Sequence, residues 1–271
     1  MGTEARARPA PPDFGLPGRT FFLGTHQVVW LERLKVPLFI SARRLRGRKH
    51  LPRAKALWAL DSGGFKELEL HGQWLLTARD YVALVRRCRT DIGRLQWAAI
   101  QDWMCEPHIL GKTGLTVREH QLRTIHSYET LQDLAPEVPW LPVLQGWAPA
   151  DYLRHLDLYA SRGHNLAQLP LVGIGSVCRR QRTQEAADIV HSLAAEGLRL
   201  HAFGFKKQGL AKVGQLLASS DSLAWSLDAR LSPPLPGCPH FSCSSCPRFA
   251  LRWRHRLLQC LGPEWVYPPR P

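Results

Sequence analysis

The sequence predicts an α/β protein, a TIM-like (β/α)8 barrel followed by a short cysteine-rich loop and a helix. Two observations predict the barrel. Short apolar runs bounded by turn residues alternate with amphipathic stretches, and polar residues recur where the apolar runs end. Such alternation implies parallel strands joined by helical crossovers. The 271 residues are enough for one barrel of this kind.

Each predicted strand is a brief apolar run that stops at turn residues. Runs this short favour buried strands over helices. About eight of them suggest closure into a barrel. The predicted strands cover residues 19–24, 36–41, 56–61, 95–102, 140–146, 169–175, 198–204 and 221–227.

The predicted helices lie between most of these strands. Several begin with Thr or Ala-Pro and close on Gly, as helix capping requires. They cover residues 77–93, 116–134, 148–163, 183–198 and 207–220.

Composition also predicts where the barrel begins and ends. Residues 1–18 are rich in Pro, Gly and Arg without apolar periodicity, so we expect a disordered basic tail. The barrel then occupies 19–232, and 233–271 form a C-terminal segment packed on it. Since no apolar run approaches the length of a membrane span, we expect a cytoplasmic protein without membrane contact.

The chain carries a formal net charge of +14, which attracts polyanions. Nucleic acid is the first candidate partner. The alternative is that the basic stretch 41–55, "SARRLRGRKHLPRAK", is only a solvated loop.

Polar residues cluster at the ends of the predicted strands. In a parallel barrel these ends converge on one face, where active sites are built. The alternative for the Asp-Ser-Gly-Gly sequence at 61–64 is a simple turn, which Asp and Gly both favour. The positions at or near carboxyl ends are Asp61, Asp102, Gln145, Gly175, Ser176, Gly204 and Lys206, while Asp221 stands at the start of the last predicted strand.

Six motifs occur in a fixed order: "LDSGGF", "AIQDWMCEP", "PVLQGW", "GIGSV", "HAFGF" and "SSDSLAWSLDAR". Together they resemble the motif set of the tRNA-guanine transglycosylase superfamily, and most closely its short members named for DeoxyPurine in DNA protein A. The resemblance runs from about residue 20 to about residue 255. It implies a pentosyltransferase that exchanges guanine in a polynucleotide, with DNA favoured over tRNA, for a 7-deazaguanine such as the 7-cyano form.

The resemblance also implies a role for each site residue. Asp221 matches the nucleophile that forms a covalent glycosyl intermediate, and Asp61 matches the general acid/base. Asp102 matches the carboxylate that binds the guanine-like edge, although a helix N-cap is its alternative interpretation. Gln145 is expected on the carbonyl side of the base. The full set expected to bind the base is Ser62, Gly63, Gly64, Phe65, Asp102, Gln145, Gly146, Gly175, Ser176 and Gly204.

The sequence "CPHFSCSSC" predicts a structural zinc site. Its ligands would be Cys238, His240, Cys243 and Cys246, since thiolates and imidazole suit tetrahedral zinc. Relatives commonly take their histidine from further downstream, so His255 is the alternative fourth ligand, and Cys260 is a weaker alternative. Three free cysteines by coincidence is the remaining interpretation.

Base exchange requires the polymer backbone to be held while one base leaves the stack. Possible further partners are a second copy of the chain in a homodimer and accessory proteins that open the duplex. The alternative functions are a nucleoside or nucleotide glycosidase, or a nucleic-acid-binding module without activity. The predicted backbone contacts are Arg43, Arg44, Arg179, Arg180, Lys206 and Lys207.

Overall fold

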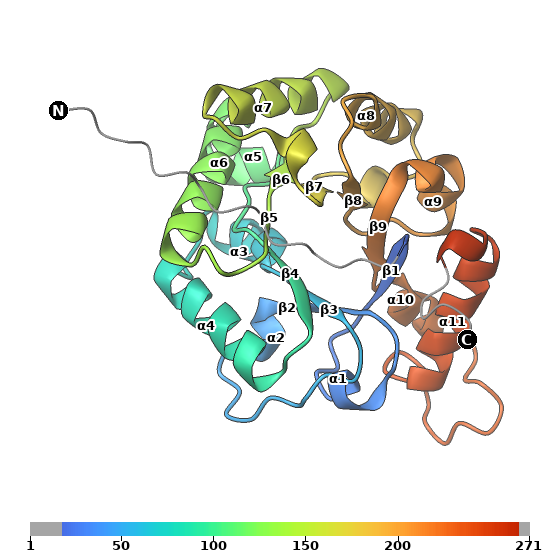
Figure 1. Ribbon diagram of the computed structural model, residues 1–271. Coiled ribbons are helices and arrows are strands. Elements are labelled where there is room, and N and C mark those ends of the chain that lie inside the picture. The colour runs from blue at the N-terminus through green and yellow to red at the C-terminus, as the bar shows by residue number, and fades with distance from the viewer. Residues whose placement is uncertain (1–17, 266–271) are drawn as a thin grey trace.

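The computed structural model describes residues 18–265 as a ring of parallel strands surrounded by helices (Figure 1). The strands form one sheet with the order β5-β4-β3-β2-β1-β9-β8-β7-β6, and the predicted α/β barrel is confirmed. The strands are β1 (Thr20–Gly24), β2 (Leu38–Ser41), β3 (Trp58–Asp61), β4 (Leu95–Ala99), β5 (Trp140–Leu141), β6 (Val143–Leu144), β7 (Val172–Ile174), β8 (Leu200–Ala202) and β9 (Leu217–Ser222).

The ring closes through one interrupted strand. β5 pairs with β4 and β6 pairs with β7, and Pro142 lies between them. Proline has no N–H, so it breaks the ladder locally. Its carbonyl still accepts a hydrogen bond of 2.8 Å from the Gly173 N–H. Residues 140–144 therefore fill one position of the ring, which agrees with the eight strands predicted.

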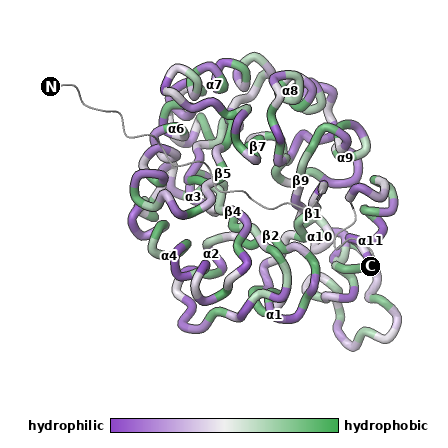
Figure 2. The backbone as a smooth tube through the Cα atoms, in the orientation of Figure 1, coloured by the Kyte–Doolittle hydropathy of each residue, from purple (hydrophilic) through white to green (hydrophobic). Residues whose placement is uncertain are grey.

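Helices cover the outside of the ring, and polar and apolar residues alternate along them (Figure 2). Thr77, Thr116 and Thr183 cap α4, α6 and α8, each accepting a backbone N–H within the first turn, as their positions in the sequence predict. The helices are α1 (Trp30–Arg33), α2 (Ala42–Leu45), α3 (Gly64–His71), α4 (Ala78–Asp91), α5 (Pro107–Thr113), α6 (Val117–Leu134), α7 (Pro149–Ser161), α8 (Gln184–Ala195), α9 (Lys207–Val213), α10 (Ala224–Arg230) and α11 (Pro247–Gln259).

The strand predicted at 221–227 is wrong, and the helix predicted at 207–220 begins as predicted at Lys207 but is too long. The helix α9 ends at Val213, the last strand is β9, and residues 224–230 form α10. The strand sequence "LASSDS" lacks β-branched residues, so its local pattern is not strand-like. Pairing with β1 on one side and β8 on the other overrides that weak local preference. The correction places Asp221 inside a strand near its carboxyl end.

Two apolar layers hold the barrel. Side chains alternate along each strand; Phe21 and Leu23 join the layer under the helices, while Phe22 points into the ring. The inner layer contains Phe22, Phe39, Ala59, Trp97, Ala99, Leu141 and Leu171.

The C-terminal helix α11 packs on the barrel at β1 and α10. Its Trp253 indole N–H donates to Asp228 at 2.7 Å, and the Trp253 ring lies 6.1 Å from that of Phe21. Apart from Gly18, the predicted tail lies outside the described residues, as do 266–271 of the C-terminal segment. Between residues 18 and 265, no helix has the length and apolar character needed to cross a membrane.

Candidate active site

A pocket of about 330 Å³ opens where the strands end. Three aspartates line it, Asp61 from β3, Asp102 from the loop after β4, and Asp221 from β9. The barrel thus brings together carboxylates that lie up to 160 positions apart in the sequence. Five more of the predicted base-site residues line the same pocket, namely Gly64, Phe65, Gly175, Ser176 and Gly204.

Asp61 stands at the tip of β3 and receives the Gly63 N–H on Oδ1 at 3.0 Å. Gly63 has a φ of +84°, and a Cβ there would lie 2.9 Å from Cγ of Arg43. The sequence at 61–64 is therefore a tight turn, and it is also part of the pocket. Burial raises the pKa of Asp61, and the charge of Asp221 raises it further, against hydrogen bonds from Gly63 and Ser41.

Asp221 is held through one of its two oxygens. Oδ1 accepts the Gly204 N–H at 3.0 Å and lies 3.4 Å from Nε2 of His201. Gly204 has a φ of +69°, and a Cβ there would lie 2.1 Å from Sγ of Cys178, so glycine is required. Asp61 and Asp221 line the same pocket, and the charge of Asp221 contributes to the raised pKa of Asp61.

Asp102 is not a helix N-cap, because α5 begins further along at Pro107 with Glu106 as its N-cap. Its carboxylate is buried and accepts a hydrogen bond from Nε2 of Gln145. Burial raises the pKa of Asp102 to about 7, and the charges of Asp61 and Glu106 contribute. A ligand that offers two N–H donors to this carboxylate would favour its ionised form.

Gln145 does not line the pocket but supports two residues that do. Its carboxamide donates to Asp102 and accepts from the Ser176 hydroxyl at 2.7 Å. A Cβ at Gly175 would lie 2.1 Å from Nε2 of Gln145, so glycine leaves room for the amide. The predicted Ser62, Gly63 and Gly146 also lie outside the pocket wall.

Several residues that line the pocket were not predicted from the sequence to belong to the base site. Glu106 is buried, and its Oε2 lies 2.9 Å from the Ser176 hydroxyl oxygen, whose single proton can be donated to Glu106 or to Gln145 but not to both at once. Its position four residues after Asp102, in "QDWMCEP", is the signal that could have identified it. Met104 and Cys178 also line the pocket, and Cys178 is exposed.

Arg179 lies at the pocket wall and is exposed. Its guanidinium stacks 4.6 Å from the centre of the Phe65 ring, so the pair joins the first turn of α3 to the segment after β7. Phe65 therefore lies under a cation at the wall, where a base or a phosphate could contact either group.

Arg180 is a correction to the predicted backbone contacts. It is buried, and its guanidinium donates to the carbonyls of Ser176 and Trp147 and to Glu185. These bonds clamp the loop after β7, which removes Arg180 from the surface that a polymer could reach. Of the remaining predicted contacts, Arg43, Arg44 and Lys207 are exposed and Lys206 is half-buried.

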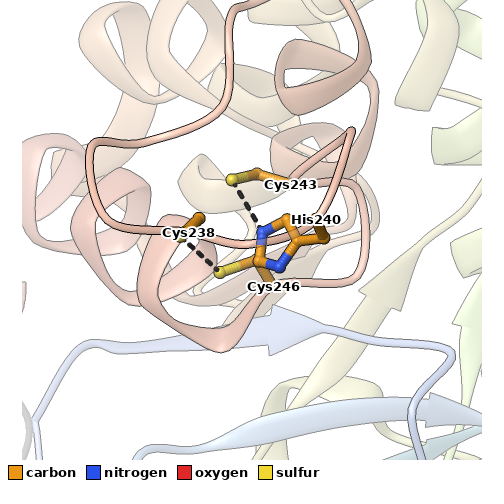
Figure 3. A group of neighbouring side chains, drawn as sticks. All are labelled: Cys238, His240, Cys243 and Cys246. Carbon is orange, nitrogen blue, oxygen red and sulfur yellow. Dashed lines mark hydrogen bonds between the residues drawn. The ribbon is translucent and has the colours of Figure 1, made fainter.

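The loop between α10 and α11 gathers Cys238, His240, Cys243 and Cys246 (Figure 3). Their ligand atoms all lie within 4.8 Å of one another. Nε2 of His240 is 3.1 Å from Sγ of Cys243. Three thiolates and one imidazole are a donor set typical of structural zinc, so this cluster could hold that metal. Within residues 18–265 His255 does not join the group, which favours His240.

We expect Cys243→Ser to release the metal and to lower Tm by roughly 10 °C, because a loss of about 3 kcal/mol shifts a domain of this size by that order. Cys243 is fully buried against Ala229 of α10, so the loop is part of the packing. Differential scanning calorimetry with metal analysis checks this. Cys260→Ser, an exposed cysteine outside the cluster, is the matched control and should keep metal and Tm. Equal metal content in the two variants would contradict the ligand assignment.

Comparison with known proteins gives one family. A family model described as DeoxyPurine in DNA protein A matches residues 18–270. No curated protein matches the chain.

Proposed function

The chain belongs to the DeoxyPurine in DNA protein A family, and we propose that it is a pentosyltransferase that exchanges guanine in DNA for a 7-deazaguanine, such as the 7-cyano form. One observation carries the proposal at the level of residues: Asp61, Asp102 and Asp221 line a single pocket at the carboxyl ends of the strands. Family membership supports DNA as the polymer. The pocket supports the division of labour among the three carboxylates.

In the proposed first step, Asp221 attacks C1′ of the target deoxyguanosine through a carboxylate oxygen. The bond from C1′ to N9 breaks, and its electron pair leaves with guanine, which takes a proton from Asp61. A covalent deoxyribosyl ester on Asp221 results. In the second step N9 of the deazaguanine loses its proton to Asp61 and attacks C1′, which releases the Asp221 carboxylate. The oxocarbenium character of both transition states is stabilised by the nearby negative charge.

The environments of the two catalytic carboxylates support this assignment. Burial, and then the charge of Asp221, raise the pKa of Asp61, so it holds a proton more readily than a solvated Asp. A general acid needs that property when guanine departs. Asp221 accepts the Gly204 N–H, which stabilises the carboxylate that a nucleophile requires.

Asp102 is proposed to bind the base edge that carries the ring N–H and the exocyclic amine. Its hydrogen bond from Gln145 orients the carboxylate toward the pocket that it lines. Adenine cannot offer the same two donors and would leave a buried charge unpaired, so it should be rejected strongly.

The polymer is proposed to lie across the exposed cations Arg43, Arg44, Arg179 and Lys207, with one nucleotide turned into the pocket. The net charge of +14 supports a polyanionic substrate. Zinc, when bound, would supply structural support to the α10–α11 loop and no step of the reaction.

The test supplies radiolabelled guanine, and separately labelled 7-cyano-7-deazaguanine, to the purified protein with duplex DNA or with tRNA. We expect label in DNA only, stable to denaturation of the duplex. Label in tRNA alone would reverse the choice of polymer. Release of free base without incorporation would instead support a glycosidase on the same barrel.

A further inference from the structure

His201 is a buried polar residue inside the barrel that the proposed reaction does not use. It lies in the middle of β8, and its neighbours Leu200 and Ala202 belong to the layer under the helices. His201 itself points into the ring and is fully buried. Aromatic rings surround it at centroid distances of 4.6 Å (Phe203) and 4.7 Å (Trp97). Placing an imidazole in such an apolar cage is costly unless its nitrogens have partners.

Both partners come from the neighbouring strand β9. The strand register places His201 beside Ser219, and Nδ1 lies 2.8 Å from the Ser219 hydroxyl. Nε2 lies 3.4 Å from Oδ1 of Asp221. Ser219 and Asp221 are two positions apart, so they share one face of the strand. Ser219, His201 and Asp221 therefore follow one another across the barrel interior, and Nε2 of His201, a buried nitrogen with no hydrogen bond within the described residues, has Oδ1 of Asp221 as its polar neighbour.

The chemistry of these groups fixes where the imidazole proton lies. Burial lowers the pKa of His201, so the ring is neutral and carries a single N–H. A carboxylate can only accept, so the proton belongs on Nε2, facing Asp221. Nδ1 then accepts from the hydroxyl of Ser219, which can donate.

The contacts of Asp221 fall on one oxygen. In the part of the chain that the structure describes, its recorded polar partners, the Gly204 N–H and His201 Nε2, both approach Oδ1. Oδ2 is thereby left for the pocket that Asp221 lines. The distance of 3.4 Å to Nε2 is longer than a well-formed hydrogen bond, as catalytic contacts often are before substrate binds.

We propose that His201 is a positioning residue for the nucleophile, whose Nε2–H holds Oδ1 of Asp221 so that Oδ2 faces C1′ of the sugar. The inference rests on the proposed function, since it assumes that Asp221 attacks. Ser219 does not contact Asp221 in this proposal; its hydroxyl donates to Nδ1 and so holds the His201 imidazole in the required tautomer. The Nε2–H also stabilises the carboxylate when the ester is broken in the second step.

The test compares His201→Phe with His201→Gln. Phenylalanine suits the aromatic cage but has no donor, whereas glutamine keeps an N–H at a similar reach. For His201→Phe we expect the single-turnover rate of adduct formation on DNA to fall roughly 10- to 100-fold, the effect of losing one hydrogen bond to a charged group. The Kd for DNA should stay within about twofold, because His201 is buried away from the polymer. His201→Gln should recover part of the rate.

A second pair of variants decides the matter if His201→Phe does not fold. Ser219→Ala removes the partner of Nδ1 and should slow adduct formation by a few-fold. Ser220→Ala is the matched control, because the Ser220 hydroxyl contacts the carbonyls of Ala202 and Phe205 at 2.9 and 3.2 Å. Its rate should equal that of the wild type.

The proposal is overturned if His201→Phe folds and forms adduct at the wild-type rate. It is also overturned if Phe and Gln are equally slow, or if Ser219→Ala and Ser220→Ala behave alike, because the residue would then serve packing only. Failure of the proposed function itself looks different: Asp221→Ala would still exchange base.

Discussion

We expect Asp221→Ala to abolish base exchange, with a loss of at least about 10³-fold in kcat, while the affinity for DNA should change little. The reason is that Asp221 is the proposed nucleophile, and alanine leaves no group to form the ester with C1′. The carboxylate is buried at the pocket wall, so its removal should not disturb the exposed cations that bind the polymer. The measurement is incorporation of labelled base, paired with a DNA-binding assay at fixed salt.

Asp133→Ala is the control for this substitution, because Asp133 is an exposed aspartate on α6. It should exchange base at the wild-type rate. Exchange by Asp221→Ala above about 1% of that rate would remove Asp221 from the nucleophile role.

Asp61→Asn should lower turnover by about 10²- to 10⁴-fold, the usual contribution of a general acid/base. Asparagine keeps the size of the side chain but can neither protonate the departing guanine nor deprotonate the incoming deazaguanine. Both steps are slowed, but the nucleophile is intact, so ester that forms is consumed slowly and a protein–DNA band should accumulate on denaturing gels over hours. Asp133→Asn is the matched control and should show no such band. Normal turnover by Asp61→Asn would place the acid/base role elsewhere.

The alternation of apolar runs and capped helices was enough to predict the barrel. The same pattern predicted the wrong elements for the last strand of the barrel, where "LASSDS" forms β9 and "AWSLDAR" forms α10. Serines have little strand preference, and the backbone of β9 is fixed by its two neighbours rather than by local sequence. Pro142, which divides a strand without ending it, is a second place where local and tertiary preferences differ.

Some features of the candidate site could likewise be predicted from the sequence, and others could not. The positions of Asp61 and Asp102 at strand ends could be anticipated from the sequence, because parallel strands end on one face. Asp221 was predicted at the start of a strand, and the pairing of β9 with its neighbours places it near a carboxyl end instead. Contacts made across the barrel could not. His201 reads in the sequence as one polar residue in an apolar strand, and only the register of β8 with β9 brings it to Asp221. The prediction that Arg180 contacts the polymer backbone was wrong for the same reason, since the charge of a residue in the sequence does not reveal whether its side chain is buried.

The central claim is that Asp221 becomes covalently bonded to the sugar. The most direct measurement incubates Asp61→Asn with a deoxyguanosine-containing duplex, digests protein and DNA, and locates the modified peptide by mass spectrometry. The account predicts a deoxyribose-linked fragment on the peptide that contains Asp221, and none in the variant that also carries Asp221→Ala. A sugar adduct on another carboxylate, or exchange that proceeds with no adduct at all, would contradict it.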